Sequence, residues 1–163
     1  MRCACGEQAT VICGDYVFVE SGLTNVTLRG VEQLKCDKCG SSTPVLSEIN
    51  KLMQVIAEAL IQKPSQLTGK EIRFLRKYTD FTGEQFGRKL GLTKEHVSRI
   101  ENEKHPVGAQ TDRLIRYLAV SASSNLASQI VPLFERLESI KDEPLQEHIE
   151  INLATGSFEY AAA

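Results

Sequence analysis

The chain has 163 residues, of which 42% are hydrophobic and 25% are charged, so it can bury a core and is not globally disordered. No apolar run reaches the roughly 18 residues that a membrane helix needs, and the polar, cysteine-rich start is unlike a signal peptide. We therefore expect a cytoplasmic protein with reduced thiols and no membrane partner.

Five cysteines lie within the first 39 residues, at Cys3, Cys5, Cys13, Cys36 and Cys39. In "CDKCG", Cys36 and Cys39 have the C-x-x-C spacing, and a tight turn at the following glycine can aim both thiolates at one tetrahedral ion. Cys3 and Cys5, also followed by a glycine, form a shortened version. We predict a structural Zn²⁺ site made of Cys3, Cys5, Cys36 and Cys39.

Other interpretations of the cysteines remain open. Cys13 is either a buried strand residue or a ligand that replaces Cys3 or Cys5. Free thiols and a Cys36–Cys39 redox pair are alternatives to a metal site, although no βαβ pattern surrounds the pair. No histidine or carboxylate is arranged to leave an open coordination position, so a catalytic zinc is not expected.

The segment between the cysteine pairs has a β pattern. The stretches "TVICGDYVFVE" and "NVTLRGVEQLKC" are rich in Val, Ile, Thr, Tyr and Phe, and "SGLTN" at 21–25 is a plausible turn. We predict a small β-rich zinc-binding domain at 1–44. Its core would be small, so the metal would supply folding free energy directly.

Residues 45–65 predict one amphipathic helix that connects two modules. Apolar residues recur there at helical spacing, namely Ile49, Leu52, Met53, Ile56 and Leu60. Ser47 is expected to cap the helix, and Pro64 is expected to end it soon after Gln62. The apolar stripe packs either on a neighbouring domain or across a dimer interface.

The net charge of −2 conceals a basic segment. Residues 66–120 carry eleven basic and seven acidic side chains, net +4, whereas residues 121–163 carry net −5. A basic module between acidic flanks suggests a surface that binds a polyanion, and a chance fluctuation of surface charge is the alternative.

Residues 66–121 contain strong helix-start signals. Thr68 with Glu71 and Thr82 with Gln85 match the capping-box pattern, and Thr93 is expected to cap a third helix. Gly91 lies where a helix ends in a left-handed residue. A short helix, a glycine turn and a second short helix make the helix-turn-helix arrangement, and "TDRLIRYLAV" adds a further amphipathic helix.

The third helix separates apolar from polar residues. At about 100° per residue, Val97 and Ile100 face the core, and the opposite stripe is polar. In that stripe Arg99 can read guanine, and Glu95 can accept a hydrogen bond from cytosine. The predicted DNA-binding residues are Thr82, Thr93, Lys94, Glu95, Ser98, Arg99 and Asn102, with Lys94 placed for a phosphate and Asn102 for an adenine or a phosphate. The alternative is a solvated helix face.

These residues carry a family resemblance. The stretch "RFLRKYTDFTGEQFGRKLGLTKEHVSRIENEKHPVGAQTDRLIRYLAV" resembles the Xre/Cro-like helix-turn-helix domains over about 50 residues. One departure is visible. Such domains commonly carry a Gln after the cap of the second helix, where it contacts the DNA backbone, and here that position is Gly83.

With the N-terminal cysteines included, the chain resembles the MqsA/YgiT-type antitoxins, and "VTLRGVEQLKCDKCG" is similar to the end of their zinc domain. The resemblance implies a homodimeric repressor of its own operon whose zinc domain binds a small ribonuclease-type toxin. In that family an Asn and an Arg four residues apart read the bases. Arg99 takes the Arg place and Glu95 the Asn place, so a different operator is expected. The alternative is a plain Xre-family regulator with a structural or sensory zinc site.

Residues 122–163 lie outside the resemblance and are acidic. "NLASQIVPLFERLESI" predicts a helix broken or started near Pro132, and "HIEINLATGSFEYA" predicts a β-hairpin that can also pair across a dimer. This tail can mimic nucleic acid, bind a basic toxin or solubilise the protein. The expected class is α+β: a small β-rich zinc-binding domain, an all-α helix-turn-helix domain and a helix/β-hairpin tail.

The sequence gives no support for an enzyme. It shows no Ser/His/Asp arrangement, no phosphate-binding glycine loop and no pair of catalytic carboxylates.

Overall fold

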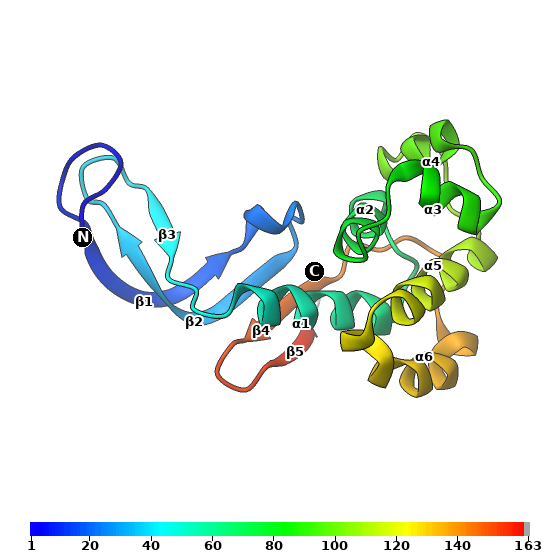
Figure 1. The fold of residues 1–163 in the computed structure, drawn as a ribbon. Coiled ribbons are helices and arrows are strands. Elements are labelled where there is room, and N and C mark those ends of the chain that lie inside the picture. The colour runs from blue at the N-terminus through cyan, green and yellow to red at the C-terminus, as the bar shows by residue number, and fades with distance from the viewer. Residues whose placement is uncertain (162–163) are drawn as a thin grey trace.

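The computed structural model describes residues 1–161, and it confirms a mixed α+β fold (Figure 1). The strands are β1 Thr10–Val17, β2 Val26–Lys35, β3 Ser42–Pro44, β4 His148–Asn152 and β5 Ser157–Ala161. The α-helices are α1 Ile49–Gln62, α2 Gly69–Tyr78, α3 Gly83–Leu90, α4 Lys94–Glu101, α5 Ala109–Ala122 and α6 Ile130–Arg136. Short 3₁₀ segments cover Val19–Ser21, Ser124–Gln129 and Leu137–Ser139.

One sheet joins the two ends of the chain. Its strand order is β1-β2-β4-β5, and β3 pairs with the far end of β2. Strands β1 and β2 form an antiparallel ribbon, whereas β4 runs parallel to β2 with Ile149 opposite Val26. Strands β4 and β5 form the predicted hairpin. The hairpin therefore pairs with β2 of its own chain, through β4.

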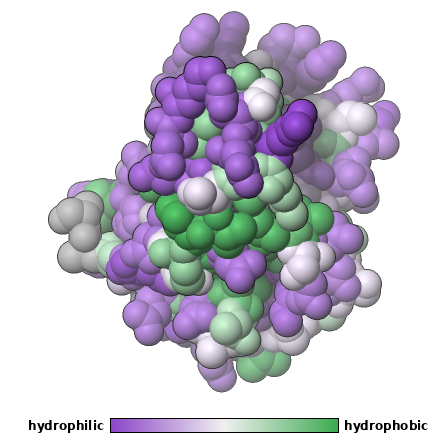
Figure 2. Space-filling model, turned by 90° about the vertical axis from the view of Figure 1, so that its left-hand side faces the viewer, coloured by the Kyte–Doolittle hydropathy of each residue, from purple (hydrophilic) through white to green (hydrophobic). Residues whose placement is uncertain are grey.

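The free end of the β1–β2 ribbon extends away from the helices (Figure 1). Val11 and Ile12 of β1 are 61% and 37% exposed. Figure 2 views the molecule from this side and shows hydrophobic surface at the centre of the face, with hydrophilic surface around it. Because so little of this segment is buried, its order depends on something besides hydrophobic burial, and a bound metal would supply it.

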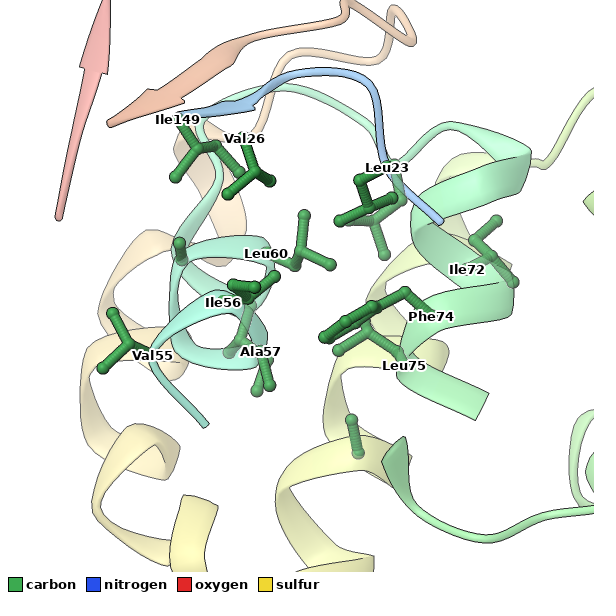
Figure 3. Close-up of a cluster of buried hydrophobic side chains, with 14 of the residues drawn as sticks. Leu23, Val26, Val55, Ile56, Ala57, Leu60, Ile72, Phe74, Leu75 and Ile149 are labelled. Carbon is green, nitrogen blue, oxygen red and sulfur yellow. The ribbon is translucent and has the colours of Figure 1, made fainter. Parts of the chain in front are cut away.

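The main core lies where the sheet meets α1 and α2 (Figure 3). Val26 of β2, Ile56 and Leu60 of α1 and Leu75 of α2 point toward one another and are at most 1% exposed. Ile72 of α2 points away from α1 and is equally buried. The same cluster continues through α4, α5 and α6. It thus runs through segments that the sequence analysis assigned to separate units, and the boundaries at 44, 65 and 121 stay predictions.

Helix α1 packs its apolar stripe inside its own chain. It ends at Gln62, before Pro64, as predicted. The predicted cap at Ser47 is wrong, because the N-cap residue is Glu48 and its side chain makes no capping hydrogen bond. Packing of the apolar face therefore holds the start of this helix without a local side-chain cap.

A buried polar network holds the helices together. Arg116 of α5 is fully buried, and its guanidinium donates to Asp112 Oδ2 at 3.0 Å and to the backbone oxygens of Ile61, Lys63 and Ser65 at 3.0, 2.7 and 2.6 Å. These bonds fix the end of α1 and the following loop against α5. A satisfied buried network of this kind specifies one arrangement of the elements that it joins.

A second buried pair links this network to the sheet. Lys63 Nζ donates to Glu71 Oε2 at 2.7 Å, and both side chains are at most 1% exposed. Asn25, at the start of β2, donates to Glu71 Oε1 at 3.3 Å and to the backbone oxygen of Glu147 at 2.6 Å. The sheet, α1, α2 and the tail therefore share one set of polar contacts.

Within residues 1–161, no helix is long and apolar enough to cross a membrane.

Candidate metal centre and candidate nucleic-acid interface

The structure brings four cysteines together at the tip of the β1–β2 ribbon. The sulfurs of Cys3, Cys5, Cys36 and Cys39 all lie within 4.8 Å of one another. The Cys3–Cys39 and Cys5–Cys36 sulfur distances are 3.5 and 3.6 Å. A tetrahedral Zn²⁺ with Zn–S bonds of about 2.3 Å needs sulfurs about 3.8 Å apart. The cluster therefore has the donor set and the size to hold one metal ion.

Two similar turns position the sulfurs. Gly6 has φ +89° and its N–H donates to Cys3 O, while Gly40 has φ +70° and its N–H donates to Cys36 O. Both glycines adopt the left-handed conformation that other residues rarely take, and each reverses the chain directly after a pair of cysteines. The shortened Cys3–Cys5 pair thus closes a turn like that of the C-x-x-C pair.

The thiols influence one another's charge. A hydrogen bond from the backbone of Cys5, followed by one from the Ser41 hydroxyl, lowers the pKa of Cys3 to about 6. A hydrogen bond from the backbone of Glu7 lowers the pKa of Cys5, but hydrogen bonds with the sulfurs of Cys3 and Cys36 outweigh it and raise this pKa to about 11. A cation bound between the sulfurs would favour the thiolate form of all four cysteines.

Of two further side chains, Cys13 lies outside the cluster and Ser41 contacts it. Cys13 lies outside it, exposed on β1, with its Sγ 3.2 Å from Gly30 O, so it is neither a buried strand residue nor part of the quartet. The Ser41 hydroxyl lies 3.3 Å from Cys3 Sγ and 3.1 Å from Cys39 Sγ. The sequence analysis missed Ser41, although its position directly after "CDKCG" was a visible signal.

Helices α3 and α4 form a helix-turn-helix. Thr82 with Gln85 makes a complete capping box at the start of α3, and Thr93 Oγ1 accepts from the N–H of His96 at the start of α4. Gly91 ends α3 in the left-handed conformation, as predicted. A Cβ on Gly87 would lie only 2.6 Å from Leu92 O. The turn therefore depends on a second glycine that the sequence analysis missed.

The predicted DNA-binding residues share one property, since all seven are exposed: Thr82, Thr93, Lys94, Glu95, Ser98, Arg99 and Asn102. Val97 and Ile100 are 3% and 5% exposed on the opposite side of α4, as the periodicity predicted. Among the described residues, neither Lys94 nor Arg99 forms an ion pair. Both cations are therefore free to meet an anionic ligand.

The end of α4 is anchored to α2. Arg76 makes two hydrogen bonds to the Glu101 carboxylate, at 2.5 and 3.0 Å, and this contact raises the pKa of Arg76 above its usual range. Asn102 caps the helix, accepts from Arg73 at 2.9 Å and donates to Ser98 O at 2.8 Å. Asn102 is exposed, but its side chain already has partners within the protein.

No family model, curated protein or solved structure matches this chain. The resemblance to the Xre/Cro-like domains and to the MqsA/YgiT-type antitoxins therefore remains the basis of a proposal.

Proposed function

We propose that this protein is a sequence-specific DNA-binding repressor that acts in the cytoplasm and is stabilised by Zn²⁺. The observation that carries the proposal is the exposed polar surface of α4, where Lys94 and Arg99 form no ion pair with any residue in 1–161. This stripe follows a glycine turn in a helix-turn-helix, which is the element that proteins commonly insert into the major groove.

The charged residues and the helix starts have distinct proposed roles. Arg99 donates to the O6 and N7 atoms of a guanine, and Glu95 accepts from the amino group of a cytosine. Lys94 and the helix starts at Thr82 and Thr93 contact phosphates, which position the protein without reading sequence. Asn102 must exchange its contacts with Arg73 and Ser98 before it can bind a base.

Zinc has a structural role in this proposal. Held by Cys3, Cys5, Cys36 and Cys39, it would stabilise the ribbon tip, where hydrophobic burial is small. The four-thiolate donor set and the tetrahedral size of the cluster support zinc as the metal.

We further propose that the protein is a homodimeric antitoxin that represses its own operon. The support is the combination of an N-terminal cysteine cluster with an Xre-like module, as in the MqsA/YgiT-type antitoxins that the sequence resembles. Co-expression with the small reading frame beside its gene tests this role. Toxicity that this protein relieves would support an antitoxin, and a harmless neighbour would contradict it.

A plain Xre-type regulator without a toxin partner is the second candidate. One observation favours it: the C-terminal hairpin pairs with β2, so this edge of the sheet is not open to a strand of another protein. The growth assay separates the two candidates, because only the antitoxin requires a toxic neighbour.

The DNA-binding proposal is tested by Arg99→Ala. Titration of a labelled promoter fragment at fixed salt should show binding weakened by about 1–3 kcal/mol, with relaxed preference at one base pair. Arg136→Ala is the matched control, since it removes an arginine from α6, outside the stripe, and should leave affinity unchanged. Unchanged affinity of Arg99→Ala would refute the assignment of α4.

A further inference from the structure

Helices α5 and α6 leave an apolar groove open at the surface. The groove has a volume of about 460 Å³ and is lined by Leu114 and Tyr117 of α5 and by Ile130, Val131 and Phe134 of α6, among others. Tyr117, Val131 and Phe134 are 53%, 60% and 75% exposed. We propose that this groove, which we call the α5–α6 groove, binds the same groove of a second copy of the chain.

The size of the surface fits a homodimer. Side chains of these types, exposed to these fractions, present on the order of 400 Å² of apolar surface. That is as large as the main apolar patch of a typical monomer, which is often functional. It is also about half of the roughly 800 Å² that each partner contributes to a standard interface. The remaining area would come from polar residues around the groove, as in the rim of a typical interface.

The shape of the groove fits a copy of itself. A two-fold interface requires that one surface carry both the projecting group and the recess that receives it. Phe134 is the most exposed of the lining side chains, and the volume of the groove, about 460 Å³, exceeds that of a phenyl ring. The same face therefore offers an aromatic anchor and a pocket, the combination found at the centre of stable interfaces.

The charges of the groove also fit self-association. Its charged lining residue is Arg113, which forms an ion pair with Asp142 at 3.3 Å and donates to Leu137 O at 3.1 Å. Two copies can meet here without opposing unpaired like charges, because the charged lining residue already has a partner in its own chain. A small polar ligand would find few groups to orient it.

The proposal gives the C-terminal extension a role, because α6 forms one wall of the groove. It deepens the proposed function, since a repressor with two half-sites needs two copies. It can nevertheless be tested without DNA, so its failure is distinguishable from failure of the DNA-binding proposal.

The experiment is sedimentation equilibrium of the zinc-loaded full chain over a range of concentrations, with no DNA. The wild type should have the mass of two chains. Val131→Glu places a charge on each side of the two-fold axis and should raise the dimer dissociation constant at least about a hundredfold. Phe134→Ser removes the anchor without adding a charge and should also dissociate the dimer.

Val11→Glu is the matched control. It makes the same change at a valine of equal exposure, 61% against 60%, on the ribbon at the other end of the molecule. It should leave the two-chain mass unchanged, and circular dichroism should show all variants folded. A monomeric wild type would overturn the proposal. A dimer that survives Val131→Glu, or one that Val11→Glu alone dissociates, would overturn it as well.

Discussion

Replacing Arg116 with methionine tests whether the buried polar network holds the helices together. Methionine keeps most of the volume but leaves the Asp112 carboxylate and the backbone oxygens of Ile61, Lys63 and Ser65 without their donor. Removing one partner of a buried ion pair costs about 3–5 kcal/mol. Since domains are stable by only about 5–15 kcal/mol, this loss is a large part of the total.

The assay is thermal and urea unfolding of the zinc-loaded protein, followed by circular dichroism. At about 2–4 °C per kcal/mol for a chain of this size, Arg116→Met should lower Tm by roughly 6–20 °C. Arg136→Met is the control, because Arg136 is exposed and makes a hydrogen bond to Gln62 O at 3.3 Å. It should cost less than about 1 kcal/mol.

A double variant makes the test sharper. Asp112→Leu with Arg116→Met removes both charges, so part of the lost stability should return. Recovery should be incomplete, because Asp112 Oδ1 also accepts from the Leu67 N–H at 2.8 Å. If Arg116→Met alone cost less than about 1 kcal/mol, the network would not be what fixes α5 against α1.

Two further predictions concern the metal centre and the helix-turn-helix. Metal analysis should find about one zinc per chain, which Cys36→Ser should lose and Cys13→Ser should retain. A wild type without zinc, or equal loss of zinc in both variants, would refute the assignment of the four cysteine ligands. Gly87→Ala should lower the free energy of unfolding by about 1–3 kcal/mol, because its Cβ would lie 2.6 Å from Leu92 O. Gly83→Ala is the control, because its Cβ would meet nothing closer than Lys94 Cγ at 3.7 Å, and it should leave the free energy of unfolding unchanged or raise it. Urea titration measures both variants, and equal effects of the two changes would contradict this reasoning.

Local signals were the most predictable part of the fold. The caps at Thr68, Thr82 and Thr93 and the left-handed Gly91 were all predicted, because each depends on groups within a few residues. The cap at Ser47 failed, because packing of α1 decides where that helix starts. The two cysteine pairs were recognisable because the spacing within each pair is local, although the contacts between the pairs span 31 and 36 positions.

Long-range features could not be predicted from the same patterns. An alternating stretch identifies a strand without naming its partner, so the parallel pairing of β4 with β2 was not foreseen. Nor does a sequence show which charges are buried. The sequence analysis included Arg116 in the net charge of the basic segment 66–120, yet this side chain is fully buried and paired with Asp112.

The parallel pairing of β2 with β4 has a consequence for synthesis of the chain. Asn25 finds its partner, Glu147 O, 122 positions later, so the edge of β2 that pairs with β4 cannot be covered until these residues have left the ribosome. Until then the edge of β2 stays open to other strands. A stop codon before β4 would therefore leave one edge of β2 unpaired, in addition to removing the hairpin itself.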